Sequence, residues 1–271
     1  MMSNKDVGTI LVDAHVHVYD CFDIDDLLSA ALRNFKHAAA NMGLADNFTG
    51  VLLLSETSRD NWFSQASTAG RLKCWRIEPV QENLVMQAEL LNNTTEKNII
   101  YIMAGRQIAT AEGIELLALI TGRSFEDGLS VEDSLTAVRE QDAIPVLPWA
   151  VGKWLGKRGK ILSGLLKAEA GSDLCIGDNS GRPVFWRNPS HFKQARALAM
   201  PLLPGSDPLP LAGETERVGR FGFSLQGKLG PSQPATDLKC LLREKGLKVK
   251  AYGRLETPWN FVINQIRLRK A

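Results

Sequence analysis

Short apolar runs alternate with amphipathic stretches along most of this 271-residue chain. The first run, Thr9 to Val18, is rich in β-branched residues and predicts a strand. The next stretch predicts a helix from Asp23, which can cap it, to about Met42, with Gly43 as its stop. Because strands that alternate with helices favour a mostly parallel sheet, the pattern predicts an α/β fold, closed as a TIM-like barrel or doubly wound.

The alternation continues to about residue 220 and then gives way to a passage rich in glycine and proline. Before that point we expect strands at Gly50–Ser55, Asn98–Met103, Ile144–Trp149, Leu174–Ile176 and Met200–Leu203, an apolar run at Ile114–Ile120, and helices at Leu84–Leu91, from Ser130, at Lys160–Ala170 and at Ser190–Ala199. After it we expect a helix at Asp237–Lys245 and strands at Leu247–Tyr252 and Val262–Leu268. The prediction is a β/α barrel over residues 1–220, which a β-α-β segment over residues 221–271 completes or covers. Pro145 and Pro148 conflict with a central strand, because proline cannot donate to the ladder.

The charge balance restricts the partners that we expect. The chain has 32 Lys and Arg against 30 Asp and Glu, a formal net charge of +2, whereas a protein that coats a polyanion needs a strongly basic face. No apolar run approaches the roughly 18–20 residues of a membrane span, and four widely spaced cysteines favour free thiols in a reducing compartment. We therefore expect a cytoplasmic protein with neither nucleic acid nor a membrane as a partner; its oligomeric state stays open.

The motif His15-Val-His17 points most directly to chemistry. Side chains alternate along a strand, so Asp13, His15 and His17 are expected on one face, near the carboxyl end where barrels carry their sites. Two neutral imidazoles on one face can bind a single divalent ion. The alternative is a hydrogen-bonded histidine pair inside the barrel without a metal.

Three acids follow predicted strands and extend this candidate site. Asp207 follows the strand that ends at Leu203, Glu56 follows Gly50–Ser55, and Asp178 follows the strand that ends at Ile176. The carboxyl ends of parallel strands meet at one edge, so these acids are expected around one polar mouth with the histidines. Taken singly, Asp207 also fits an ordinary turn aspartate.

Five short stretches carry a resemblance to a known family. They are His15–His17 as an opening His-x-His, Leu54–Thr57 in place of Thr-Asp-His, Gly105–Ile108 in place of Gly-x-Glu-Ile, Ile144–Trp149 in place of a strand that ends in His-Pro, and Gly205–Asp207 as the start of Gly-Ser-Asp-Ala-His. Together they resemble the PHP (polymerase and histidinol phosphatase) superfamily of metal-dependent hydrolases, which are distorted (β/α)7 barrels related to the amidohydrolases. The resemblance implies a barrel fold and metal-dependent hydrolysis.

The chain departs from the family pattern at several ligand positions. Glu56 replaces an aspartate, Thr57 and Pro148 stand where histidines belong, Gln107 replaces a glutamate, and Leu209 stands near the place of the last histidine. The multi-metal cluster of the family therefore cannot form. The resemblance leaves room for one ion on His15, His17 and Asp207, with Glu56 as a further ligand, or for no ion.

A basic loop follows Trp149 and carries Lys153, Lys157 and Arg158 among glycines. On the expected mouth this loop, together with Arg182, suits a phosphate or carboxylate through charge-assisted hydrogen bonds. A solvated loop that begins a helix explains the same residues equally well.

These observations favour a metal-dependent hydrolase of a small anionic substrate, with a phosphoester preferred. One zinc, manganese or iron ion on His15, His17 and Asp207 would activate water. Glu56 or Asp178 would act as a ligand or accept the proton. The alternative is a barrel that has lost its metal cluster and binds a ligand or a protein without catalysis.

Overall fold

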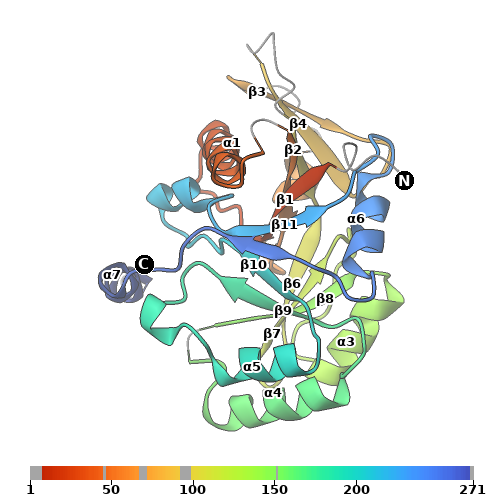
Figure 1. Ribbon diagram of the computed structural model, residues 1–271, viewed down its shortest axis with the longest axis vertical. Helices are drawn as coiled ribbons and strands as arrows, with labels where there is room; N and C mark the ends of the chain where they lie inside the picture. The colour runs from red at the N-terminus through yellow and green to blue at the C-terminus, as the bar shows by residue number, and fades with distance from the viewer. Residues whose placement is uncertain (1–7, 45–46, 67–71, 92–98, 151, 269–271) are drawn as a thin grey trace.

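The computed structural model describes residues 8–44, 47–66, 72–91, 99–150 and 152–268, and its strands form two mixed sheets (Figure 1). The seven-stranded sheet has the order β12-β11-β1-β2-β5-β4-β3, and the five-stranded sheet the order β10-β9-β8-β7-β6. The first sheet consists of β1 (Thr9–Val16), β2 (Phe48–Leu54), β3 (Trp75–Pro79), β4 (Val85–Leu90), β5 (Ile99–Met103), β11 (Gly222–Gln226) and β12 (Lys250–Tyr252). The second consists of β6 (Gly105–Ala109), β7 (Glu115–Leu119), β8 (Ile144–Pro148), β9 (Cys175–Asn179) and β10 (Leu202–Gly205).

Helices cover the outer faces of both sheets (Figure 1). Helix α1 (Ile24–Asn41) packs on the first sheet, and α3 (Val131–Glu140), α4 (Gly156–Ala168) and α5 (Ser190–Ala197) pack on the second. The remaining helical elements are α2 (Trp62–Ala66), α6 (Pro234–Leu242), α7 (Pro258–Leu268) and the 3₁₀ helices η1 (Val184–Trp186) and η2 (Ala212–Arg217). In the described part of the chain, the helices fall short of the length and apolar character that a bilayer span requires.

Buried apolar side chains form three clusters that hold these layers together. The middle cluster joins the two sheets face to face, with Val12 and Phe223 from one sheet and Leu117 and Val146 from the other. One outer cluster lies under α1, and the other lies under α3, α4 and α5. Each sheet is therefore apolar on both faces, as expected for strands that helices cover on one side. The predicted α/β class is confirmed.

Neither sheet is closed into the predicted barrel over the described residues. The first half of β1 lies between β11 and β2, and β2 lies between β1 and β5, so these edges are already occupied. Strand β10 contacts β1, and strand β6 contacts the end of β2, only past the residues that pair with β11 and β5. At the β1–β10 seam the Asp207 N–H donates to the His15 carbonyl over 2.8 Å. At the β2–β6 seam the Glu56 N–H donates to the Gly105 carbonyl over 3.1 Å.

A glycine allows the close approach of the backbones at each seam. A Cβ atom on Gly205 would lie 2.4 Å from the His15 nitrogen, and one on Gly105 would lie 2.2 Å from the Leu54 carbonyl oxygen. Such distances leave no room for a side chain, so both positions require glycine. The two glycines belong to the Gly-x-Glu-Ile and Gly-Ser-Asp positions of the family pattern.

Helix α1 forms as predicted. Asp23 accepts a hydrogen bond from the Asp26 N–H at its start, and Gly43, with a φ of 72°, follows its end. Its buried face includes Leu28, Ala31 and Phe35, which pack against the first sheet. Capping, periodicity and the terminal glycine are local signals, and they agree here with the tertiary packing.

Two predicted elements have the wrong type. Residues Leu84–Leu91 form not a helix but strand β4, because pairing with β3 on one side and β5 on the other outweighs local preference. Residues Val262–Leu268 belong to helix α7, which begins at Pro258, a residue that fits the first turn of a helix. The C-terminal segment is therefore β-α-β-α, and the domain boundary at residue 220 stays a prediction.

The two prolines of the Ile144–Trp149 run lie within β8, between β7 and β9. Pro145 lies opposite Ala118 and Pro148 opposite Gly177. The predicted strand is thus present in spite of the lost donors.

The β1–β10 seam gives a first test of the fold. Gly205→Ala is expected to lower the free energy of unfolding by about 1–3 kcal/mol, because the added methyl group forces the backbones apart. Gly164→Ala is the matched control: that glycine is exposed within α4, and a methyl group added there would meet no atom within 4 Å. The control should be neutral or stabilising by up to about 1 kcal/mol. Urea unfolding measures both, and equal stabilities for the two variants would contradict the seam.

Candidate metal centre

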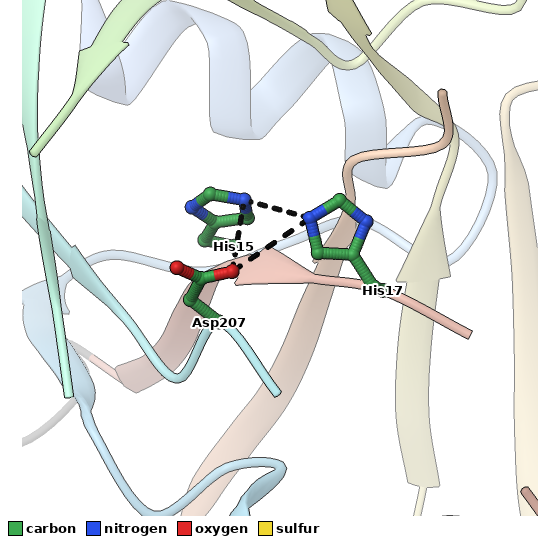
Figure 2. Close-up of side chains that lie close together, drawn as sticks. All are labelled: His15, His17 and Asp207. Atoms are coloured by element: carbon green, nitrogen blue, oxygen red, sulfur yellow. Dashed lines mark hydrogen bonds and ion pairs between the residues drawn. The ribbon is translucent and has the colours of Figure 1, made fainter. Parts of the chain in front are cut away.

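Three ligand atoms converge where β1 and β10 meet (Figure 2). The Nε2 atoms of His15 and His17 lie 3.0 Å apart, and Asp207 Oδ1 lies 3.6 Å from the first and 3.7 Å from the second. Among the described residues these three side chains form a group whose ligand atoms all lie within 4.8 Å of one another. The predicted pairing of the His-x-His motif with Asp207 therefore exists in the structure.

Both imidazoles are neutral at pH 7. They are 5% and 4% exposed, and this burial lowers the pKa of His15 and of His17 to about 4. His17 Nδ1 is buried and has no hydrogen-bond partner among the described residues. Neutral imidazole nitrogens and a carboxylate are ligands that zinc and iron accept, so this donor set fits a divalent ion.

Asp207 reaches the histidines from an unusual backbone conformation. Its φ is 48°, in the left-handed region that aspartate tolerates better than most residues. Its N–H donates to the His15 carbonyl, and its Oδ2 accepts from Asn179 Nδ2 over 2.9 Å, which leaves Oδ1 directed at the imidazoles. Burial raises the pKa of Asp207 to about 6, while the nearby His17 opposes this rise.

Asp13, which strand alternation predicts on the same face as His15 and His17, makes contacts of its own. It is fully buried and accepts backbone N–H bonds from Ser206 at 2.7 Å, Gly219 at 2.8 Å and His15 at 3.3 Å. Burial raises the pKa of Asp13 to about 7, and these hydrogen bonds act against the rise. Asp13 thus connects β1 to the residue after β10 and to the loop before β11, and it is not one of the three converging ligands.

Glu56 does not join the three converging ligands. Its Oε2 lies 2.8 Å from the Arg106 guanidinium, and its Oε1 accepts from the Phe63 N–H over 2.6 Å. Burial raises the pKa of Glu56, and Arg106 counteracts this. These contacts occupy both carboxylate oxygens, so they do not support the predicted roles of Glu56 as metal ligand and catalytic group.

Asp178 and Arg182 occupy each other. The Arg182 guanidinium donates to Oδ1 and Oδ2 of Asp178 over 2.7 and 2.6 Å, and its remaining nitrogen donates to the carbonyls of Trp186 and Arg187. Both side chains are at least nine-tenths buried. The pair therefore braces the turn after β9, and neither the catalytic role predicted for Asp178 nor the substrate-binding role predicted for Arg182 is supported by these contacts.

Of the three predicted cations of the basic loop, Lys153 lies beside the candidate metal ligands, and Lys157 and Arg158 do not. Lys153 pairs with Glu115 and lines a pocket of about 330 Å³ beside Asp207. Lys157 is exposed on α4, and Arg158 lies 3.5 Å from the Gly113 carbonyl. The pocket is also lined by Asn179, Arg217 and, from α7, Phe261, Asn264 and Gln265. Of the predicted cations of this loop, only Lys153 lines the pocket.

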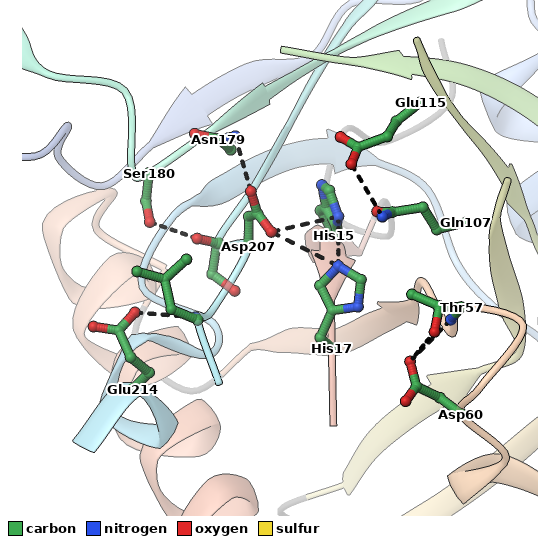
Figure 3. A network of polar contacts seen from close by, with 12 residues as sticks. His15, His17, Thr57, Asp60, Gln107, Glu115, Asn179, Ser180, Asp207 and Glu214 are labelled. Carbon is green, nitrogen blue, oxygen red and sulfur yellow. Dashed lines mark hydrogen bonds and ion pairs between the residues drawn. The ribbon is translucent and has the colours of Figure 1, made fainter. Parts of the chain in front are cut away.

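Glu115 is the residue that sequence reasoning missed. Its side chain accepts a hydrogen bond from Gln107 Nε2 over 3.4 Å (Figure 3). Its negative charge opposes the lowering of the pKa of His15 and His17 by burial, and it adds to the rise in the pKa of Asp207. It begins β7, which runs antiparallel to β8, so the amino end of β7 lies at the same edge as the carboxyl ends of the parallel strands β8, β9 and β10. A search confined to the carboxyl ends of strands overlooks such an acid.

The Asp178–Arg182 pair yields a prediction. Asp178→Asn is expected to lower the free energy of unfolding by about 3–5 kcal/mol, because it leaves a buried guanidinium without its counter-charge. The double variant Asp178→Asn/Arg182→Met should recover part of that loss, since no buried charge remains. Urea unfolding and elemental analysis measure stability and metal content. A stable Asp178→Asn protein that has lost a metal-dependent activity would instead show a catalytic Asp178.

Comparisons with known proteins inform the fold. No family model and no curated protein sequence matches this chain. The structure is similar to that of PsfC from Pseudomonas syringae PB-5123, with a TM-score of 0.55 and 17% identity over 97% of this chain and 99% of that one. It is also similar to the lesion-specific endonuclease PfuEndoQ from Pyrococcus furiosus, with a TM-score of 0.53 and 12% identity over 90% of this chain and 57% of that one.

A further structure, an endonuclease Q in complex with a 27-mer duplex with an abasic lesion at its active site, is 12% identical over 96% of this chain and 67% of that one, with a TM-score of 0.49. The expectation that nucleic acid is excluded as a partner is wrong, since a similar fold occurs in a lesion-specific endonuclease. The balanced net charge was a poor guide, because it averages over the surface and says nothing of a local site. The similarities to PsfC and to PfuEndoQ support the α/β fold.

Proposed function

We propose that this protein is a metal-dependent phosphoesterase of the PHP type, with one divalent ion on His15, His17 and Asp207. The observation that carries the proposal is the convergence of three ligand atoms within 4.8 Å of one another where β1 and β10 meet. Three protein ligands leave coordination positions open, which is the arrangement of catalytic rather than structural sites. We propose zinc, manganese or iron as the ion, because imidazole and carboxylate ligands suit all three.

Such an ion supplies Lewis acidity to a phosphoryl oxygen and makes water a stronger acid. The pocket beside Asp207 is the proposed place for the phosphoester. Its cations are Lys153 and Arg217. A charge-assisted hydrogen bond from Lys153 would hold a phosphoryl group, and Arg217, whose three nitrogens already contact Glu214, Glu256 and Ser180, would contribute its charge. Arg217 is itself positioned by ion pairs with Glu214 and Glu256, so its guanidinium is held at the pocket wall.

Glu115 is the proposed proton acceptor, in place of Glu56 and Asp178. It lines the same pocket as Asp207, and its side chain keeps 21% exposure. Glu56 and Asp178 are bound by arginines whose side chains are 16% and 5% exposed, whereas the Glu115 partner Lys153 is 39% exposed and can turn toward a substrate. A carboxylate at this position can accept a proton from the attacking water.

The volume of the pocket bears on the substrate. About 330 Å³ is enough for a phosphoryl group with one small substituent, at the lower end of ligand pockets. A longer phosphodiester, including one in DNA, would have to extend out of the pocket. The similarity in fold to a lesion-specific endonuclease makes that substrate one to be tested.

A second candidate function is ligand binding without catalysis. Glu56 stands at a position that the family pattern assigns to a metal ligand, but its carboxylate forms an ion pair with Arg106. This arrangement favours a site with one ion or none. Metal content and turnover separate the two candidates.

Metal content is the first prediction of the proposal. The wild type should retain a single equivalent of metal, and both His15→Ala/His17→Ala and Asp207→Asn should lose it. Asparagine keeps the left-handed turn and removes the charge, so the second variant tests the site even if the first does not fold. His37→Ala, at an exposed position on α1, is the control and should keep the metal. Elemental analysis without metal in either wild type or control, even after reloading, would overturn the proposed centre.

Catalysis is the second prediction. Metal-loaded wild type should hydrolyse 4-nitrophenyl phosphate, its diester or a lesion-containing DNA duplex, and Glu115→Gln should lower kcat by about 10²–10⁴-fold with unchanged metal content. Lys153→Met should mainly raise KM. A loaded protein that is inactive on all three substrates would favour the binding function instead, while full activity of Glu115→Gln would remove its role as proton acceptor.

A further inference from the structure

A second cavity, of about 570 Å³, lies between the C-terminal half of α1 and the turn after β12. It shares no lining residue with the pocket beside the metal ligands. Its lining residues include Arg220, Lys250 and Arg254, together with His37. We call it the basic cleft.

The charge of the basic cleft is unbalanced. None of its described lining residues is an acid. The side chains of Arg220, Lys250 and Arg254 are exposed and make no ion pair with a carboxylate of the described residues, whereas many other cations of this protein are paired. Glu216 is the acid nearest to Arg220 in the sequence, and both of its carboxylate oxygens accept hydrogen bonds from Arg33. Three cations in one concavity repel one another unless an anion binds between them.

The walls of the cleft are held in place by specific contacts. Gly253 has a φ of 89°, and a Cβ atom there would lie 2.1 Å from the Arg220 carbonyl oxygen. The glycine thus brings the backbones of Arg220 and Arg254 together. On the other side, Asn34 Nδ2 donates to the carbonyls of Glu216 and Val218, which ties α1 to the segment before β11. The cations therefore project from a braced frame and not from a free loop.

We propose that the basic cleft binds a small molecule that carries a diphosphate group. Guanidinium groups donate to phosphate oxygens in a bidentate manner, and three cations match more than one phosphoryl group. The volume lies in the range of pockets that enclose a small organic ligand. Ala38 and Met42 of α1 line the same cavity and provide an apolar side for the organic part of such a ligand. A gathered set of cations in one cavity fits a compact anion better than a long polyanion, which needs an extended basic track.

The experiment is a calorimetric titration of the whole protein with inorganic pyrophosphate and with ADP at matched ionic strength. Arg220→Gln/Arg254→Gln should weaken binding at least tenfold and leave the melting temperature and the metal content unchanged. Arg123→Gln/Lys193→Gln removes the same charge at exposed positions outside the cleft and should bind as the wild type does. Equal affinities for the two anions would assign the site to free diphosphate, and tighter binding of ADP would assign it to a nucleotide.

Three outcomes would overturn the proposal. They are a wild type that binds neither anion, equal weakening in the control, and retention of a short DNA duplex through these arginines without diphosphate binding. The readout does not depend on catalysis, so a failed metal centre and a failed basic cleft give different results.

Discussion

The buried carboxylate of Asp13 is the contact on which the arrangement of this protein depends. It lies in β1, between β11 and β2, and accepts hydrogen bonds from the backbone N–H groups of Ser206, after β10, and of Gly219, before β11. A buried carboxylate without partners is costly, so the fold that supplies these donors is favoured over arrangements that withhold them. The same carboxylate fixes the β1–β10 seam, and Asp207 extends from that seam toward His15 and His17. The centre is thus a consequence of how two sheets are joined.

The two other acids that follow strands, Glu56 and Asp178, are also buried, but arginine side chains compensate their charge. Glu56 and Asp178 are buried, and each has an arginine as its counter-charge, Arg106 and Arg182. A buried carboxylate needs hydrogen-bond donors or a counter-charge, and for these two acids the protein itself provides an arginine. Asp207 alone among the three predicted acids faces neutral imidazoles, which leaves it available for an ion. This distribution of charge explains why one ion, and not a cluster, fits the residues present.

The sequence predicted that His15, His17 and Asp207 lie together, and their role as metal ligands stays a proposal. Period-two alternation was enough to bring His15 and His17 together, and the position of Asp207 after a strand was enough to place it near them, because both are local signals read against a parallel sheet. Glu115 was missed because β7 runs antiparallel, and chain direction is decided by pairing with β8. Strand β4 and helix α7 were assigned the wrong type for a related reason: short segments take the structure that their neighbours impose.

The sequence by itself determined the α/β class, the α1 helix with its caps and the His-x-His motif, since each rests on spacing within a few residues. Tertiary structure decided which acids are free, how far the sheets close and where the cations gather. Glu56 and Asp178 are the counter-ions of Arg106 and Arg182. The two sheets do not close into a barrel, because β11 and β5 occupy the edges of β1 and β2. In the basic cleft, Gly253 permits a close backbone contact that brings Arg220 near Arg254. Edge competition and the pairing of Glu56 with Arg106 act between residues far apart in the chain, and no local pattern encodes them, whereas Asp178 and Arg182 are only four residues apart.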